Sequence, residues 1–308
     1  MALLITPYFG TPELWRRELD VLMPGLDVRF WPDVGDPADI ESVALVALPP
    51  GTLRTFPNLR LIISLTAGID SLMRDSDLPD VPIVRAADPA GDAMMNESAL
   101  LHVLRHHRGM PAYVRAQARR EWKRQPVRRA DERSVGVMGL GSVGLACAET
   151  IASLGFKVAG WVRSPRQAGG IEIFAGPEQL HAFLARSEIL LNLLPLTPET
   201  RGIINAETLR RLPAGASVIN LGRGEHVVEA DLMAVLDSGH LAAATLDVFH
   251  QEPLPSDSPL WVHPKITIMP HVARRLDASI LAPRVCAILN DFDAGKPLDQ
   301  QVDRGRGY

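Results

Sequence analysis

Three short strings in the second half of the sequence carry an arginine, carboxylates and a histidine, each just after an apolar stretch. They are INLGRGEHV with Arg223, LDVFHQEPLP with Asp247 and Glu252, and IMPHVA with His271. Open α/β sheets place their chemistry at the carboxyl ends of strands, so these side chains are candidates for one site. An arginine can clamp a carboxylate and polarise the adjacent carbonyl, and a histidine beside a carboxylate can donate a proton. The set suits reduction of a 2-oxo acid, although each residue alone also fits an ordinary loop or cap.

The string SVGVMGLGSVG contains a G-x-G-x-x-G motif formed by Gly139, Gly141 and Gly144. An apolar run precedes it and a helical pattern over 142–155 follows, which is the context of a dinucleotide-binding turn. The first glycine permits a tight turn, the second lets the backbone approach a pyrophosphate, and the third allows close helix–strand packing. Free N–H groups at the helix N-terminus would then face the phosphates. The alternative is a glycine-rich turn that serves packing alone.

The segment VAGWVRSPR indicates which dinucleotide is bound. An NAD-specific site carries an Asp or Glu about 20 residues past the glycines, where it binds the ribose 2′-hydroxyl. This sequence instead has Arg163, Ser164 and Arg166. Guanidinium groups and a hydroxyl satisfy the oxygens of a 2′-phosphate, which a carboxylate would repel. We therefore expect NADP(H) to be preferred. NAD(H) stays possible if the two arginines are only surface residues.

The composition narrows the class of partner. The 308 residues are 46% hydrophobic and 22% charged, with a net charge of −4. The chain therefore lacks the overall positive charge that would attract nucleic acid or an anionic membrane. We see no signal peptide and no apolar run near the roughly 20 residues of a membrane span. The two cysteines, Cys147 and Cys286, fit buried thiols in a reducing compartment. We expect a cytoplasmic protein, and no residue set is assigned to a metal.

Short apolar runs alternate with amphipathic stretches along the whole chain, which is typical of parallel α/β sheets. The second series of runs, from Ser134 onward, is nearly continuously apolar and therefore predicts strands buried on both faces. Two α/β units are expected, the second starting near residue 100. Strands are predicted over 2–6, 27–31, 43–48, 60–65, 82–87, 134–139, 157–162, 188–195, 216–222, 243–249 and 265–270.

A basic stretch connects the two predicted units. From Arg105 to Arg133 it holds ten Arg or Lys residues against three acids. Nucleic-acid binding is one interpretation, and a solvated face on a connecting helix and loop is the other. We favour the second, because the rest of the chain is acidic and Tyr113 and Trp122 are the only aromatic residues in the stretch.

The motifs GLGSVG, NLGRG, LDVFHQEPLP and PHVA resemble those of the D-2-hydroxyacid dehydrogenases. More narrowly, GWVRSPR, NLLPLTPETRGIIN, HVVEADLMAVLDSG, SPLWVHP and the terminal QVDRGRGY are similar to the glyoxylate/hydroxypyruvate reductase A group of that family. The resemblance covers essentially the whole chain. It implies NADPH-dependent reduction of glyoxylate, hydroxypyruvate or a related 2-oxo acid to the D-2-hydroxy acid. It also implies two Rossmann- or flavodoxin-like parallel-sheet domains with the active site in the cleft between them: a substrate-binding domain over 1–98 plus 274–308 and an NAD(P)-binding domain over 99–273.

The resemblance also implies roles for individual residues. Arg223 binds substrate, Glu252 supports the base and His271 is the proton donor, while Asp247 holds the nicotinamide carboxamide. The loop TAGIDS would contact the substrate carboxylate through the backbone amides of Ala67, Gly68 and Ile69. A homodimer built around the connecting helix would give the basic stretch, with Trp122, an interface role. The expected cofactor-binding residues are Gly139, Leu140, Gly141, Ser142, Val143, Gly144, Arg163, Ser164, Arg166, Leu194, Pro195, Gly222 and Asp247.

Two departures from the family pattern bear on specificity. Ala47 and Leu48 stand where an aromatic residue and a histidine are expected near the substrate, which suggests tolerance for a bulkier 2-oxo acid. Arg274 and Arg275 follow the histidine where small or hydroxyl residues are common. The alternatives are an NAD-linked D-2-hydroxyacid dehydrogenase acting on a bulkier substrate, or a dinucleotide-sensing interaction protein of the same fold.

Overall fold

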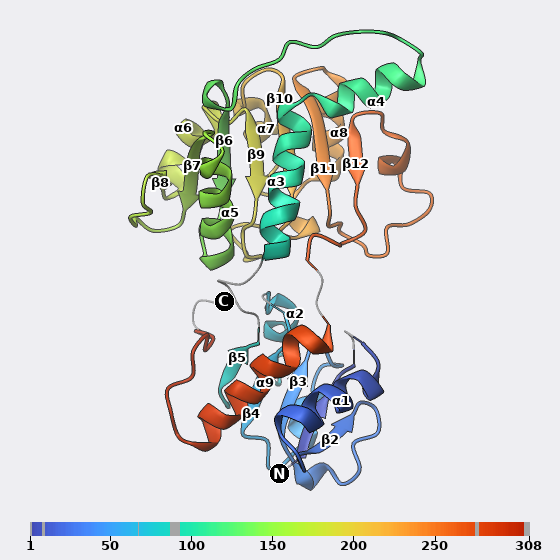
Figure 1. The fold of residues 1–308 in the computed structure, drawn as a ribbon, viewed down its shortest axis with the longest axis vertical. Helices are drawn as coiled ribbons and strands as arrows, with labels where there is room; N and C mark the ends of the chain where they lie inside the picture. The colour runs from blue at the N-terminus through green and yellow to red at the C-terminus, as the bar shows by residue number, and fades with distance from the viewer. Residues whose placement is uncertain (1, 8–9, 67, 87–92, 275–276, 305–308) are drawn as a thin grey trace. The chain divides into compact units, whose positions relative to one another are not determined.

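The computed structural model divides the chain into two compact units, each built on its own parallel sheet (Figure 1). The first unit is Met1–Asp88 with Leu276–Tyr308, and the second is Pro89–Arg275. The structure describes all residues except 1, 8–9, 67, 87–92, 275–276 and 305–308. Within the described residues, no helix combines the length and the apolar character that crossing a bilayer requires.

The sheet of the first unit has the strand order β2-β1-β3-β4-β5, with every neighbouring pair parallel. This is the order of flavodoxin-like sheets. Alternate residues of β1 enter two different apolar clusters, Leu3 and Ile5 on one face and Ala2 and Leu4 on the other. Both faces are therefore covered, which explains the continuous apolar run. The elements are β1 (Ala2–Ile5), α1 (Pro12–Leu22), β2 (Asp27–Phe30), β3 (Ile40–Leu45), β4 (Leu61–Ser64), α2 (Asp70–Met73), β5 (Ile83–Arg85) and α9 (Ala278–Asp293).

The sheet of the second unit has the order β12-β11-β10-β9-β6-β7-β8, again with parallel pairs. Numbered within the unit, this is the 3-2-1-4-5-6 Rossmann order with one added strand, and its switch point lies between β6 and β9. The strands are β6 (Ser134–Met138), β7 (Lys157–Val162), β8 (Glu172–Ala175), β9 (Ile189–Asn192), β10 (Ala216–Asn220), β11 (Leu241–Leu246) and β12 (Ile266–Ile268).

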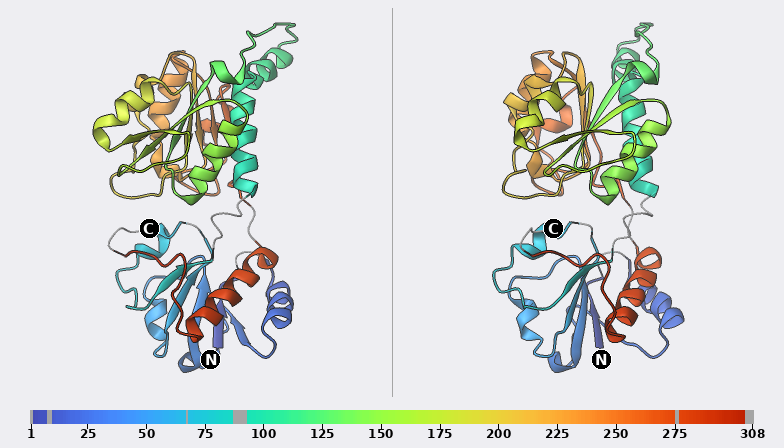
Figure 2. Two further views of the ribbon diagram at one scale, coloured as in Figure 1. Left: turned by 60° about the vertical axis from the view of Figure 1, so that its left-hand side comes forward. Right: turned by 90° about the vertical axis from the view of Figure 1, so that its left-hand side faces the viewer.

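Helices cover both faces of this second sheet (Figure 2). One face carries α3 (Ala93–His107) and α5 (Ser142–Ser153), and the other carries α6 (Leu180–Ala185), α7 (Ala206–Arg211) and α8 (Glu229–Asp237). A further helix, α4 (Met110–Ala118), follows α3. The domain boundary predicted between residues 98 and 99 falls inside α3. Because Ala99 and Val103 are buried in the core of the second unit, that helix belongs wholly to it.

Candidate active site

The glycine turn after β6 contains two glycines that the packing requires and one that it does not. Gly139 has φ +89°, and a Cβ there would lie 2.8 Å from the carbonyl oxygen of Leu193. A Cβ on Gly144 would lie 1.8 Å from the carbonyl oxygen of Gly139. Gly141 has φ −60°, and its Cβ would meet no described atom within 4 Å. The fold needs the first and third glycines, whereas the open space beside Gly141 is what a pyrophosphate at the start of α5 would use.

The predicted 2′-phosphate residues follow the carboxyl end of β7. Arg163, Ser164 and Arg166 are all exposed, and the Arg166 guanidinium donates from Nη1 to the carbonyl oxygen of Leu140 in the glycine turn. Both arginines line a cavity of about 340 Å³ at the carboxyl ends of β7 and β8. Arg166 thus contacts the glycine turn and Arg163 lines the same cavity, so two cations are available to a phosphate group there. The other lining residues are Pro165, Ile173, Ala175, Gly176, Glu178 and Gln179.

His271 and Glu252 lie together although 19 residues separate them in sequence. His271 Nδ1 is 2.6 Å from Glu252 Oε2, and Glu252 Oε1 accepts the backbone N–H of Phe249 at 2.9 Å. The hydrogen bond to Glu252 raises the pKa of His271, against the opposing effect of burial. Burial acts to raise the pKa of Glu252, but the hydrogen bonds from His271 and Phe249 outweigh it and the pKa is lowered. The pair therefore favours an imidazolium beside a carboxylate, with Nε2 left to act on a substrate.

Asp247 shapes the loop that carries His271. Its carboxylate is buried and accepts the backbone N–H groups of Val272 at 2.8 Å and Ala273 at 3.0 Å. Its own carbonyl oxygen accepts the N–H of His271 at 2.8 Å. Ser98 on α3 adds a hydrogen bond to the Ala273 carbonyl at 2.8 Å. These bonds hold His271 at φ +54°, a left-handed conformation that costs a non-glycine residue about 1–3 kcal/mol.

Arg223 belongs to the same electrostatic group. Its positive charge acts to lower the pKa of both His271 and Glu252, and the negative charge of Asp247 acts to raise that of His271. The Arg223 Nη1 donates to the carbonyl oxygen of Gly222 at 2.9 Å, which places the guanidinium along the turn after β10. The second unit thus brings together Arg223, Asp247, Glu252 and His271, the four residues predicted at three separate strand ends.

A buried polar cluster beneath this group was not predicted. Asn192 ends β9 and Asn220 ends β10, and they are register partners in the sheet. His226 lies in the short 3-10 turn Gly224–His226, and all three side chains are fully buried. The strings LLN and VIN carry the only sequence signal, a polar residue closing each of two apolar strands. Leu194, Pro195 and Gly222, expected at the cofactor, lie on the loops that this cluster holds.

A histidine with a strongly lowered pKa lies in the core of the second unit. Burial, assisted by the charges of His102, Arg105 and Arg133, lowers the pKa of His106 to about 3. Its Nε2 is 2.9 Å from the hydroxyl of Thr245, inside β11. His106 is thus a neutral core residue that joins α3 to the sheet, rather than a proton donor.

The loop expected to bind the substrate carboxylate follows β4 in the first unit. Ala67 lies outside the described residues. The Thr66 hydroxyl donates to the Gly68 carbonyl at 2.6 Å, and Ile69 is buried. These two contacts hold the Gly68 carbonyl and the Ile69 side chain against the first unit. Leu48 packs against the same apolar cluster as Ile69, which gives it a role in the core of the first unit.

The remaining specificity residues are placed only in part. Ala47 is exposed just past β3, at the carboxyl edge of the first sheet. Arg275 lies outside the described residues. Arg274 directly follows Ala273, whose N–H is bound by Asp247.

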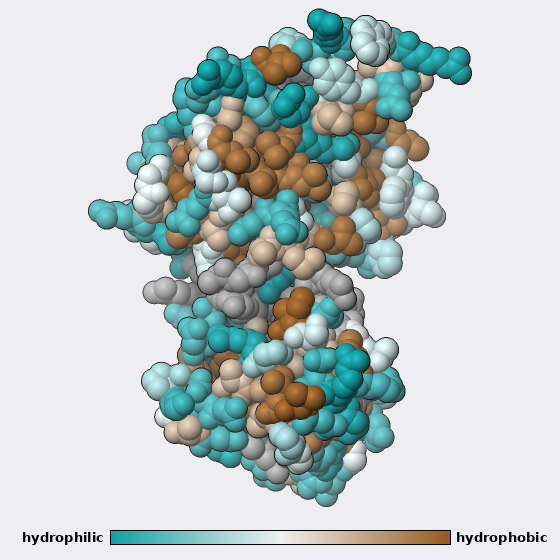
Figure 3. All heavy atoms as spheres, in the orientation of Figure 1, coloured by the Kyte–Doolittle hydropathy of each residue, from teal (hydrophilic) through white to brown (hydrophobic). Residues whose placement is uncertain are grey.

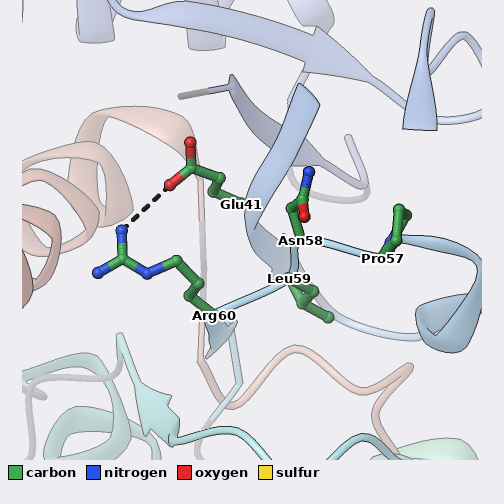
Figure 4. A pocket seen from close by; sticks show the side chains of 5 residues that line it. All are labelled: Glu41, Pro57, Asn58, Leu59 and Arg60. Atoms are coloured by element: carbon green, nitrogen blue, oxygen red, sulfur yellow. Dashed lines mark hydrogen bonds and ion pairs between the residues drawn. The ribbon is translucent and has the colours of Figure 1, made fainter. Parts of the chain in front are cut away.

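A second hollow lies in the first unit, at the amino ends of β3 and β4 (Figure 4). Its main polar feature is an ion pair between Arg60 Nη1 and Glu41 Oε2 at 3.1 Å, and the Arg60 guanidinium also stacks over the ring of Phe292. These contacts satisfy the two charges within the protein. Because parallel sheets bind ligands at the carboxyl ends of their strands, this hollow is not a candidate site. Its other lining residues are Pro57, Asn58 and Leu59.

Comparison with known proteins agrees with this geometry. Residues 100–273 match the model of the D-isomer specific 2-hydroxyacid dehydrogenase, NAD binding domain. The chain is 40% identical to glyoxylate/hydroxypyruvate reductase A of Salmonella enteritidis PT4, over 98% of each chain. A D-isomer specific 2-hydroxyacid dehydrogenase from Xanthobacter autotrophicus Py2, crystallised with NADPH and MES, superposes with TM-score 0.95 at 44% identity, covering 100% of this chain and 99% of that one. An NADPH-dependent glyoxylate/hydroxypyruvate reductase from Sinorhizobium meliloti, in complex with NADP and sulfate, gives TM-score 0.92 at 35% identity, with the same coverage. The chain belongs to the D-isomer specific 2-hydroxyacid dehydrogenase family.

Proposed function

We propose that this protein is an NADPH-dependent reductase of glyoxylate, hydroxypyruvate or a related 2-oxo acid, and that it forms the D-2-hydroxy acid. The observation that carries the proposal is the His271–Glu252 pair at 2.6 Å, with Arg223 in electrostatic reach of both. The NADPH-bound family member at 44% identity and the reductase at 40% identity support the cofactor and the substrate class.

Each of the proposed site residues has a defined task in this reaction. Bound NADPH supplies the hydride. Arg223 clamps the substrate carboxylate and polarises the carbonyl, because its planar fork matches a carboxylate. His271 gives the proton from Nε2 to the carbonyl oxygen, and Glu252 at Nδ1 holds the ring in orientation and stabilises the imidazolium. The backbone amides of Gly68 and Ile69 bind the substrate carboxylate, and Asp247 holds the nicotinamide carboxamide beside its task in the His271 loop.

The test is an assay of the purified chain with NADPH and with NADH, over a series from glyoxylate and hydroxypyruvate to phenylpyruvate. Turnover with NADPH and the small 2-oxo acids is expected, and turnover of phenylpyruvate would follow from the small side chain of Ala47. An unchanged preference for glyoxylate over phenylpyruvate would reject the role given to Ala47. No turnover with either nucleotide would reject the enzyme and favour a dinucleotide-sensing protein of the same fold.

Replacing Arg163 with alanine is expected to raise the Kd for NADPH by about 10–100-fold and to leave the Kd for NADH unchanged. Arg166→Ala should also raise the Kd for NADPH, but it weakens NADH binding to a smaller extent as well, because it removes the hydrogen bond to the Leu140 carbonyl in the glycine turn. Each substitution removes charge-assisted hydrogen bonds to the 2′-phosphate, which NADH lacks. Quenching of protein fluorescence measures both constants. Arg211→Ala is the matched control, because Arg211 is a half-exposed arginine of the same unit that pairs with Glu207. Equal weakening of NADH binding would show that the arginines do not read the phosphate.

The rate of 2-oxo acid reduction is expected to fall as pH rises through the raised pKa of His271, since the imidazolium is the proton donor. Glu252→Gln removes the group that raises this pKa, so the alkaline limb of the kcat profile should move to lower pH. A kcat–pH profile of both proteins, with NADPH saturating, measures the shift. An alkaline limb at the same pH in Glu252→Gln would mean that a different group donates the proton.

We also propose a homodimer built around α3 and the segment that follows it. Trp122 is 95% exposed and Val127 73% exposed, and Leu101 on α3 and Val114 on α4 are exposed as well. Apolar side chains gather over α3 on the face shown in Figure 3, and exposed apolar groups of this kind mark protein–protein contacts. The Arg and Lys residues around Trp122 would then form a polar rim. We place the enzyme in the cytoplasm, where the buried thiols of Cys147 and Cys286, which form no disulfide, stay reduced.

Substituting serine for Trp122 or Val127 is expected to convert the dimer to monomer in light scattering after gel filtration. The large apolar anchors would leave water on association, so their loss removes the main driving force. Val21→Ser is the control, because Val21 on α1 is 78% exposed and lies in the other unit. A wild-type monomer, or unchanged dimers in both variants, would contradict the proposed interface.

A further inference from the structure

Hydrogen bonds join the side chains of Asn192, Asn220 and His226 to one another and to the neighbouring backbone. Asn192 Nδ2 donates to Asn220 Oδ1 at 2.8 Å and to His226 Nδ1 at 2.9 Å. Asn220 Oδ1 also accepts the N–H of Gly222 at 3.2 Å, and Asn220 Nδ2 donates to the Arg223 carbonyl at 2.9 Å. Asn192 Oδ1 accepts the N–H of Leu194 at 3.3 Å, so the side-chain oxygen and nitrogen of both asparagines are all used, as buried polar groups require.

Two backbone groups fix the protonation of His226. Its Nδ1 accepts the N–H of Arg223 at 3.1 Å, so that nitrogen carries no proton. Its Nε2 lies 3.2 Å from the carbonyl oxygen of Pro195, which can only accept, so Nε2 carries the proton. This assignment does not depend on how the asparagine amides are oriented. His226 is therefore a neutral ring with a proton on Nε2 only.

This ring joins two loops that the proposed reaction uses differently. Its Nε2 holds the Leu194–Pro195 loop after β9, which is proposed to line the cofactor. Its Nδ1 holds the backbone of Arg223 after β10, the residue proposed to bind the substrate. The residues between the two loops are closely packed, because a Cβ on Gly222 would lie 3.0 Å from both Asn192 Nδ2 and His226 Nδ1.

We infer that His226 is a positioning residue: through its two ring nitrogens it fixes the position of the Arg223 backbone relative to the Pro195 loop. This inference rests on the proposed function. The two nitrogens act on different ligands: Nδ1 governs how well Arg223 meets the 2-oxo acid, and Nε2 governs how well the Pro195 loop meets the dinucleotide. A side chain that keeps one nitrogen's hydrogen bonds and loses the other's separates the two effects.

Two conservative substitutions divide the ring in this way. His226→Asn keeps an acceptor at the Nδ1 position and loses the donor to Pro195, so the Kd for NADPH should rise about tenfold with little change in the KM of the 2-oxo acid. His226→Gln keeps a donor at the Nε2 position and loses the acceptor for Arg223, so the KM should rise about tenfold with the Kd for NADPH near the wild-type value. Fluorescence titration gives the Kd without turnover, and steady-state rates give the KM.

The control is His240→Gln, since His240 Nε2 also contacts a backbone carbonyl of the same unit, that of Leu212 at 3.0 Å, away from the site residues. It should leave both constants unchanged, and a thermal melt of each variant reports any general loss of stability. Constants within twofold of wild type in both His226 variants would overturn the inference, and so would equal effects of both variants on Kd and KM. A wild-type chain that binds NADPH but reduces no 2-oxo acid would instead reject the proposed function, and the Kd of His226→Asn would still test the cofactor half.

Discussion

Replacing His271 with asparagine is expected to lower kcat for 2-oxo acid reduction by about 10²–10⁴-fold, the usual contribution of a general acid. The Kd for NADPH should stay within about twofold of wild type, because the imidazole is proposed to act on the substrate carbonyl and not on the dinucleotide. Asparagine can still bond to Glu252 at the Nδ1 position, so the loop held by Asp247 should keep its shape. Single-turnover oxidation of bound NADPH measures the chemical step directly.

A suitable control for this substitution is His181→Asn. His181 also faces a carboxylate, with its Nε2 3.5 Å from Glu207 Oε1, and its side chain is half-exposed, as is that of His271. His181→Asn removes this histidine–carboxylate pair and should leave turnover unchanged. A His271→Asn protein that retains kcat within tenfold would show that water or another residue supplies the proton.

The strands and the glycine turn could be predicted from the sequence because they depend on local pattern. All eleven predicted strands occur, and β8 alone was missed among the twelve described. Glu172–Ala175 is a short strand at the sheet edge, and its half-buried residues show neither the continuous apolar run nor a clean alternation. The continuous apolar run of a buried strand is a strong sequence signal, and this short segment lacks it.

The site was harder to predict because its geometry depends on long-range contacts. Glu252 and His271 could be named as partners only through resemblance, and their 2.6 Å contact requires the carboxyl ends of β11 and β12 to meet. The left-handed backbone of His271 has no sequence signal, since the residue type does not require it. His226 was missed for a related reason. A histidine six residues past the end of β10 is unremarkable until the fold buries it between the ends of two strands.

Replacing Arg223 with glutamine is expected to lower kcat/KM by about 10²–10³-fold or more, through a higher KM and a lower kcat together. The guanidinium is proposed to hold the substrate carboxylate in the ground state and to stabilise the negative charge that grows on the carbonyl oxygen. Glutamine is neutral and can do neither with a charge-assisted bond. Arg223→Lys keeps the charge but loses the planar fork, so its kcat/KM should lie between those of wild type and the glutamine variant.

The split between kcat and KM decides what Arg223 does. A rise in KM with kcat unchanged would mean that the side chain binds ground state and transition state equally, and the polarising role would be rejected. Loss of both, with an unchanged Kd for NADPH, supports the double role. Arg201→Gln is the control, because Arg201 is an exposed arginine of the same unit whose guanidinium lies 3.9 Å from Glu225. Removing Arg223 also removes a charge that lowers the pKa of His271, so the alkaline limb of the residual activity should move to higher pH, a shift that loss of substrate binding alone would not cause.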